Sequence, residues 1–258
     1  MVIFLQQKPS TMIKKFVGLS SNDGNTALVP PLWAFGPWNE FGGEFNDSNG
    51  SALIEIQRYI SMDIPVSVHL GNLHFFPLGD EVGHEEYYEQ LNQQINALGV
   101  QVLAYFNSMI DVNYTSDYKY ALNHSYFVVN PTRNGSNGQY DPYLFQYKGA
   151  GPNPFYCGVL DLTEASAYEW FQQQMAKSVK MGFRGFMYDY GEYIDPKAFF
   201  QGNGKYGKEM HNRYPVVYQQ CAHDYFISIT NQSLVNGVNA PDFIFYARSG
   251  YVGKCFFF

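Results

Sequence analysis

The fold is decided by one stretch of the sequence, Gly185-Phe186-Met187-Tyr188-Asp189-Tyr190-Gly191-Glu192-Tyr193. Its apolar and aromatic run ends at a carboxylate, which is typical of a buried strand that emerges into a site. Because side chains alternate along a strand, we expect Met187 and Asp189 on one face and Tyr188 on the other. Gly191 then allows the backbone to turn, and Glu192 follows three residues after Asp189.

Two functions are open for the acids of this stretch. Two carboxyls beside a glycine, surrounded by tyrosines, suit the positive charge that develops on a sugar in an oxocarbenium-like transition state. The alternative is structural: Asp189 caps the next helix and Glu192 occupies its first turn. The residue types alone leave both interpretations open.

Composition excludes several classes of partner. The chain has 258 residues, enough for one domain with a sizeable core, and a net charge of -7. Without a run of Lys or Arg, neither nucleic acid nor an anionic membrane is an expected partner. No apolar run reaches the ~18 residues of a membrane span. The three cysteines show no metal-ligand spacing, so we expect no zinc site, and the sequence implies no other metal and no organic cofactor.

The sequence leaves the compartment unknown. Glycosylation sequons favour a secretory, lysosomal or extracellular relative, and they occur at Asn46, Asn49, Asn113, Asn123, Asn134 and Asn231.

The segment from Phe186 to Tyr193 resembles the nucleophile strand of glycoside hydrolase family 31, which contains α-glucosidases, α-xylosidases and sulfoquinovosidases. The resemblance implies an α/β fold of the (β/α)8 TIM-barrel type and a retaining α-glycosidase whose nucleophile is Asp189. Further segments similar to the family follow one another in the family's order: 30–38, 98–107, 161–170, 209–215 and 243–250.

The resemblance also implies roles around Asp189. Arg248, at the end of the last apolar run, would stabilise charge or bind substrate, with a surface arginine as the alternative. Glu192 would hold the loop without touching the sugar. The expected partner is a carbohydrate, an α-glycoside. Expected substrate contacts are Trp38, Tyr188, Tyr190 and His211, and for His211 helix packing is the alternative.

The chain divides into a lead-in helix (Pro9–Leu19) and loop over residues 1–29, and a partial barrel over residues 30–258. Within the barrel we expect strands at 64–70, 100–106, 186–188 and 243–247, helices at 52–61, 85–98, 164–181 and 209–229, and a first strand near Trp38. Residues 108–154 read as one long loop with short strands, on the catalytic rim.

About five βα units are therefore predicted of the eight in a full barrel. Nothing before Phe258 resembles the family's sixth strand, whose Asp is the general acid/base. The hypothesis of hydrolysis thus has an alternative: a catalytically inactive fragment or paralogue that at most binds carbohydrate. The sugar, the linkage, the general acid/base and the oligomeric state stay open at this point.

Overall fold

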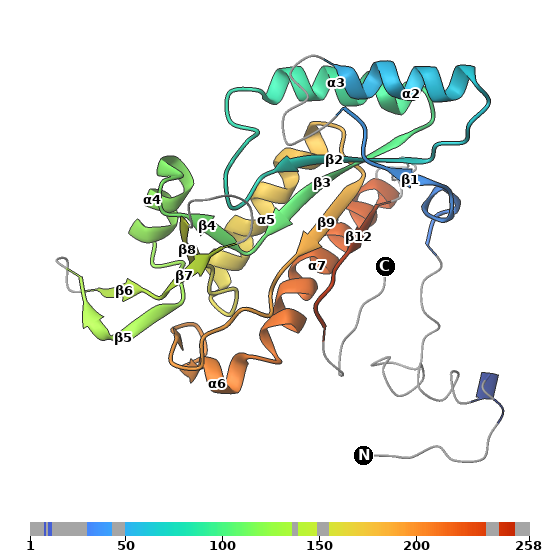
Figure 1. The fold of residues 1–258 in the computed structure, drawn as a ribbon. Coiled ribbons are helices and arrows are strands. Elements are labelled where there is room, and N and C mark those ends of the chain that lie inside the picture. The colour runs from blue at the N-terminus through green and yellow to red at the C-terminus, as the bar shows by residue number, and fades with distance from the viewer. Residues whose placement is uncertain are drawn as a thin grey trace.

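The computed structural model describes residues 8, 10–11, 30–42, 50–135, 139–148, 155–235 and 243–250 (Figure 1). Apart from Ser10 and Thr11, which are helical, the predicted helix Pro9–Leu19 lies outside these ranges, and so do the sequons at Asn46 and Asn49. The division of the chain after residue 29 therefore stays a prediction.

A sheet of five parallel strands forms the centre of the molecule. Its order, β1-β2-β3-β9-β12, follows the chain, and every pairing within it is parallel. This confirms the predicted α/β fold as a partial barrel with five strands. The strands are β1 (Trp38–Asn39), β2 (Val68–His74), β3 (Gln101–Asn107), β9 (Gly185–Asp189) and β12 (Ile244–Tyr246).

Four long helices follow the first four strands in turn and pack on one face of the sheet. They are α2 (Ser51–Ser61), α3 (Glu85–Ala97), α5 (Ala165–Lys180) and α7 (Tyr214–Val235). The large hydrophobic core lies between the two layers and is rich in aromatic rings. Phe106 and Tyr188 point into it from the sheet, and Phe171 and Tyr218 point into it from the helices.

The opposite face of the sheet is concave and buries much less. Its inward side chains Val68, Leu103 and Ile244 form a small separate cluster. Trp38 and Tyr246 come from the two outer strands, yet their ring centroids are only 5.4 Å apart. The sheet therefore curves strongly enough for its edges to meet across the concave side, as in a barrel.

Between β3 and α5 the chain makes a long excursion that builds two small antiparallel sheets (Figure 1). One sheet has the order β4-β8-β7, and the other joins β5 and β6 to β10 and β11 from the loop after β9. The sequence predicted a loop with short strands here, but a helix, α4, is also present. The elements are β4 (Met109–Asp111), α4 (Thr115–Asn123), β5 (Val129–Asn134), β6 (Tyr140–Pro142), β7 (Leu144–Tyr147), β8 (Phe155–Val159), β10 (Phe199–Phe200) and β11 (Lys205–Tyr206).

Prolines explain two differences from the predicted boundaries. The strand expected at 64–70 begins only at Val68, because Pro65 has no N–H to donate to a neighbouring strand. The helix expected at 209–229 is split into α6 (Gly207–Met210) and α7, because Pro215 cannot donate the helical hydrogen bond back to His211. Before β1 the chain forms a 3-10 turn, η1 (Leu32–Phe35).

In the ranges that the structure describes, no helix has both the length and the apolar character that crossing a bilayer requires.

Candidate active site

The candidate site lies where β3, β9 and β12 end, at the carboxyl edge of the parallel sheet. Asp189 is the last residue of β9 and pairs in register with Asn107, the last residue of β3. Tyr105 and Asp189 share the concave face through strand alternation, and Arg248 follows β12 by two residues. In barrels of this type, polar residues at this edge are the usual source of catalytic groups.

The backbone turns sharply directly after Asp189. Tyr190 has φ 63° and Gly191 has φ 94°, so two successive residues are left-handed. A Cβ on Gly191 would lie 2.9 Å from the Tyr218 ring, which leaves room only for glycine. The residues after Asp189 form no helix, so the alternative of a helix cap is wrong. A left-handed tyrosine costs on the order of 1–3 kcal/mol and marks a backbone held by its surroundings.

Two partners hold the carboxylate of Asp189, whose residue is only 7% exposed. The hydroxyl of Tyr105 donates a hydrogen bond of 2.9 Å to Oδ2. Burial, and then the charge of Asp189, raise the pKa of Tyr105, so its proton stays available for donation. On the other side, Nε of Arg248 lies 2.9 Å from Oδ1 and forms an ion pair without an aligned hydrogen bond.

Arg248 is shared between two acids. Its Nε also lies 3.0 Å from Oε1 of Glu192, so one cation bridges both carboxylates. The guanidinium covers the Tyr190 ring at 4.2 Å and approaches the Tyr193 ring at 5.6 Å. Partial burial opposes the charge of Arg248, but the two carboxylates outweigh it and its pKa is raised. The arginine is thus oriented by its neighbours although its side chain is 46% exposed.

His74, at the end of β2, lies against the Tyr105 ring with a centroid distance of 4.1 Å. Burial lowers the pKa of His74 to about 4, although the charge of Asp189 acts in the opposite direction. The imidazole is therefore neutral near pH 7 and adds no second cation beside Asp189.

Sequence reasoning assigned no role to Tyr105 and Asn107. Asn107 is fully buried beside Asp189, and among the described residues neither its Oδ1 nor its Nδ2 has a hydrogen-bond partner. Such an amide costs about 1–3 kcal/mol for each unsatisfied group, unless water or a ligand meets it. The signal available in the sequence was its place as the polar last residue of a barrel strand.

The structure brings together Asp189, Glu192, Arg248 and Tyr190, but it separates the other predicted residues. Tyr188 is fully buried on the opposite face of β9, where its hydroxyl donates to the Tyr218 carbonyl at 3.0 Å and its ring stacks on Tyr218 at 3.8 Å. It therefore belongs to the core, and the expected sugar contact does not fit.

Trp38 and His211 lie further out. Trp38 is half-buried on the concave face beside Tyr246, and its indole N–H donates to the Ala34 carbonyl at 3.0 Å. His211 is exposed at the end of α6, with Nδ1 3.2 Å from the Ile194 carbonyl, so it contacts the loop after β9 and not Asp189 itself. Across the described part of the chain, no group of three or more His, Cys, Asp or Glu is placed to hold a metal ion.

Comparison with known proteins gives several matches. The sulfoquinovosidase of Escherichia coli K12 is 30% identical over 177 residues, which are 66% of this chain and 23% of that enzyme. The α-xylosidase XylQ of Lactiplantibacillus pentosus is 26% identical over 205 residues, 76% of this chain and 25% of that enzyme. The chain thus spans about a quarter of the length of these curated relatives.

Solved structures share the fold. A family 31 sulfoquinovosidase from E. rectale, in complex with an aza-sugar inhibitor, superposes with a TM-score of 0.63 at 22% identity, over 87% of this chain and 32% of that chain. A dextranase from Flavobacterium johnsoniae, complexed with glucose, gives 0.67 at 18% identity, over 93% and 28%. The family model described as "Glycosyl hydrolases family 31 TIM-barrel domain" matches residues 27–255. The chain belongs to glycoside hydrolase family 31.

Proposed function

We propose that the chain takes part in the hydrolysis of O-glycosyl bonds of an α-glycoside, as a retaining glycosidase with Asp189 as the nucleophile. The observation that carries the proposal is the environment of Asp189. A nearly buried carboxylate at the carboxyl end of a barrel strand is held between the Tyr105 hydroxyl and the Arg248 guanidinium. Nucleophilic carboxylates need this combination of ionisation and fixed orientation.

The proposed reaction has two steps. A carboxylate oxygen of Asp189 bonds to the anomeric carbon while the bond from that carbon to the leaving oxygen breaks, and the bonding electrons go to the leaving oxygen. Water then attacks the anomeric carbon of the glycosyl ester, the bond from that carbon to the Asp189 oxygen breaks with its electrons going to the carboxylate, and the proton that water loses goes to the solvent. A poor leaving group also needs a proton from a general acid, whereas an activated aryl oxide leaves without one.

Arg248 and Glu192 have complementary roles in this proposal. The guanidinium gives the nearly buried Asp189 a countercharge, because an isolated carboxylate in that position would be costly. Glu192 forms an ion pair with the same guanidinium, so the positive charge of Arg248 is shared between two carboxylates and does not neutralise Asp189 completely. Tyr190 and Tyr193 fix the plane of the guanidinium. Trp38, with Tyr246 beside it, remains a candidate to contact the sugar from the concave face.

The proposal is tested with aryl α-glycosides that carry an activated leaving group. The purified chain would be mixed with the 2,4-dinitrophenyl α-glucoside, α-xyloside and α-sulfoquinovoside, and aryl release followed on the millisecond to minute scale. We expect a burst or steady release with one of the three sugars. Asp189→Ala should lower it by about 10⁴-fold or more, as removal of a covalent nucleophile does.

Asp224→Ala is the matched control, since Asp224 is an exposed aspartate on α7 whose carboxylate accepts from the Tyr168 hydroxyl. It should leave the rate unchanged. A folded chain that releases no aryl alcohol from any of the three would contradict catalysis by this chain. The family relationship would then be compatible only with carbohydrate binding.

A further inference from the structure

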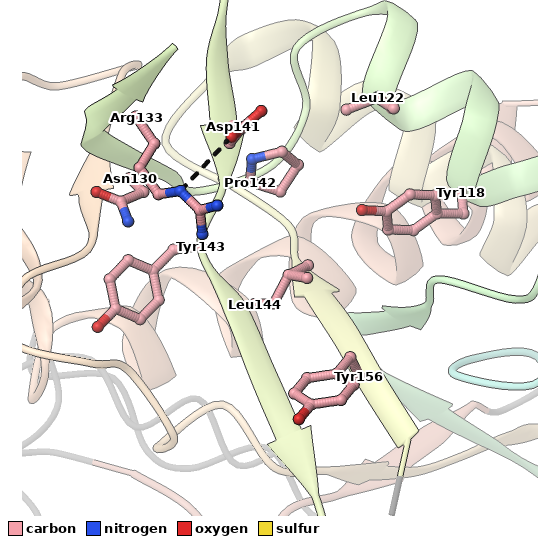
Figure 2. Close-up of a pocket in the computed structure, with 9 residues that line it drawn as sticks. All are labelled: Tyr118, Leu122, Asn130, Arg133, Asp141, Pro142, Tyr143, Leu144 and Tyr156. Atoms are coloured by element: carbon pink, nitrogen blue, oxygen red, sulfur yellow. Dashed lines mark ion pairs between the residues drawn. The ribbon is translucent and has the colours of Figure 1, made fainter. Parts of the chain in front are cut away.

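A groove lined by tyrosines lies where the excursion between β3 and α5 meets the segment after β9, apart from the catalytic carboxylates. Two hollows of about 600 and 570 Å³ share Asn130 and Tyr143 as a common wall. Figure 2 shows the first hollow, with side chains from α4, β5, β7 and β8 around it. We define the tyrosine groove by Tyr118, Tyr156, Tyr143, Tyr206, Asn130 and Arg133.

The groove combines ring faces with planar polar groups. Tyr156 lines the first hollow and is 46% exposed. Tyr206 lines the second hollow and is 40% exposed, with the Lys208 ammonium 5.9 Å from its ring centroid and Phe199 packed edge-on against it. Asn130 and Tyr143 line both hollows, and the ion pair of Arg133 with Asp141, whose Nε and Oδ2 are 3.9 Å apart, lines the first. In Figure 2 the guanidinium of Arg133 lies between Asn130 and Asp141.

The charges around the groove are balanced, which argues against a polyanionic ligand. Lys197 and Lys208 line the second hollow and Arg133 lines the first. Asp141 forms an ion pair with Arg133, and both line the first hollow. Asp195 accepts a hydrogen bond from Tyr143, and Glu209 accepts one from the backbone N–H of Tyr206. A ligand that presents flat apolar faces and many hydroxyls, without net charge, matches this lining best.

The groove is connected to the loop that follows the nucleophile strand. Tyr143 and Leu144 also line a third hollow, of about 250 Å³, together with Tyr193 and Asp195. The ring centroid of Phe145, the next residue of β7, lies 5.3 Å from that of Tyr193. The Tyr193 centroid lies 5.2 Å from that of Tyr190. A long ligand in the groove would therefore run toward the loop that carries Glu192.

We infer that the tyrosine groove is a second carbohydrate-binding site, which holds a distant part of a linear, neutral oligosaccharide. The ring faces of Tyr156, Tyr143 and Tyr206 would stack on successive sugar units, and Asn130, Arg133 and Asp141 would bind their hydroxyls. The choice of α-linked glycans as the ligand class rests on the proposed function, and two glucan hexaoses serve as the probes. The site itself rests on the groove and its lining.

The test measures binding separately from hydrolysis. The full chain with Asp189→Ala, which cannot turn over its ligand, would be titrated with isomaltohexaose and with maltohexaose in a calorimeter. We expect binding to at least one of them. Tyr156→Ala and Tyr143→Ala, each added to that background, should weaken binding about tenfold, as the loss of one stacking contact does. Tyr156→Phe keeps the ring and should retain the affinity.

Tyr140→Ala is the matched control, because Tyr140 is exposed to a similar extent, 42%, on β6 but does not line the groove. It should bind like the parent. Binding that is unchanged in Tyr156→Ala and Tyr143→Ala would place the sugar elsewhere and overturn the inference. The inference would also be overturned if a folded sample bound neither sugar at about 10 mM ligand.

The two proposals can fail separately. Binding that depends on Tyr156, in a chain that releases no aryl alcohol, would support the groove and contradict the nucleophile. Aryl release that depends on Asp189, without oligosaccharide binding in the groove, would do the reverse.

Discussion

Asp189 and Glu81 are both buried carboxyls, but they differ in the polar groups that surround them. Asp189 is 7% exposed and has a hydroxyl donor and a guanidinium within 2.9 Å. Glu81 is 2% exposed, in the connection from β2 to α3, and its Oε2 has no hydrogen-bond partner among the described residues. Burial raises the pKa of Glu81 to about 8, with Asp117 adding to the shift and Lys177 reducing it.

The difference lies in the partners that the fold gives the two acids. Desolvation penalises the charged form of a buried carboxyl, and donors and cations placed by the surrounding strands offset that penalty. The edge of the parallel sheet supplies them to Asp189 from β3 and from the residues after β12. Glu81 lies outside that edge and stays protonated near pH 7.

Removal of the Arg248 cation, which separates the environment of Asp189 from that of Glu81, should have the largest effect on activity. Arg248→Ala leaves Asp189 and Glu192 as two neighbouring carboxylates without their shared partner. We expect kcat/KM for an aryl α-glycoside to fall about 10²–10³-fold, the range found when one electrostatic stabiliser is removed. Arg58→Ala, on the exposed side of α2, should leave it unchanged. An equal fall in both variants would show that the loss is not specific to the site.

Glu81→Gln should raise stability in a pH-dependent way. The folded state keeps the proton of Glu81 up to about pH 8, whereas the unfolded carboxyl loses it near 4.5. Between these values unfolding releases a proton, so stability falls as pH rises, by up to about 1.4 kcal/mol per unit.

The glutamine variant stays neutral and escapes this loss. Urea unfolding should show a gain of roughly 3 kcal/mol at pH 7 that shrinks toward pH 4.5. A gain that is the same at both pH values would mean that Glu81 does not titrate as described.

Tyr105→Phe tests the hydroxyl donor to Asp189. A hydrogen bond to a charged group contributes about 1.5–3 kcal/mol, so we expect kcat/KM to fall about 10–100-fold, mainly through kcat. Tyr214→Phe is the control, because it removes a buried hydroxyl that donates to the Leu160 carbonyl, away from Asp189. If both variants lose stability but neither loses activity, Tyr105 does not position the nucleophile.

Tyr188→Phe should have the smallest effect and concerns only the core face of β9. The change removes the hydrogen bond to the Tyr218 carbonyl, worth about 1 kcal/mol, and leaves the stacked rings in place. Urea unfolding should record that loss. In contrast, kcat/KM should stay within about twofold of the parent, a smaller change than the loss of a hydrogen bond to the substrate would cause. A strong effect on KM would restore Tyr188 as a substrate contact.

Much of the sheet could be predicted from the sequence, because local patterns determine it. The run before Asp189 predicts a strand whose side chains alternate, and the structure has that strand and that alternation. The same alternation already placed Tyr188 opposite Asp189, so its assignment as a sugar contact conflicted with the strand geometry. The glycine after the strand indicated the turn that follows, where Gly191 has φ 94°.

Among the neighbours of Asp189, Arg248 and Glu192 were predicted from the family resemblance, but Tyr105 could not be predicted from local patterns. Tyr105 lies within an apolar run and reads as a core residue, and only the register of β3 against β9 brings it to the carboxylate. The excursion from β4 to β8 was unpredictable for a related reason. Its strands are three to six residues long and are fixed by antiparallel pairing with distant segments.

The most direct test of Asp189 as nucleophile is the capture of its glycosyl ester. The chain would be treated with a 5-fluoroglycosyl fluoride of the sugar that it hydrolyses. The ring fluorine slows both steps, and the fluoride leaving group keeps the first step fast enough for the ester to accumulate. Digestion and mass spectrometry should then find one added glycosyl group on the peptide that contains Asp189, and none in Asp189→Ala. An adduct on Glu192 or another carboxyl, or turnover that continues without any adduct, would contradict the account.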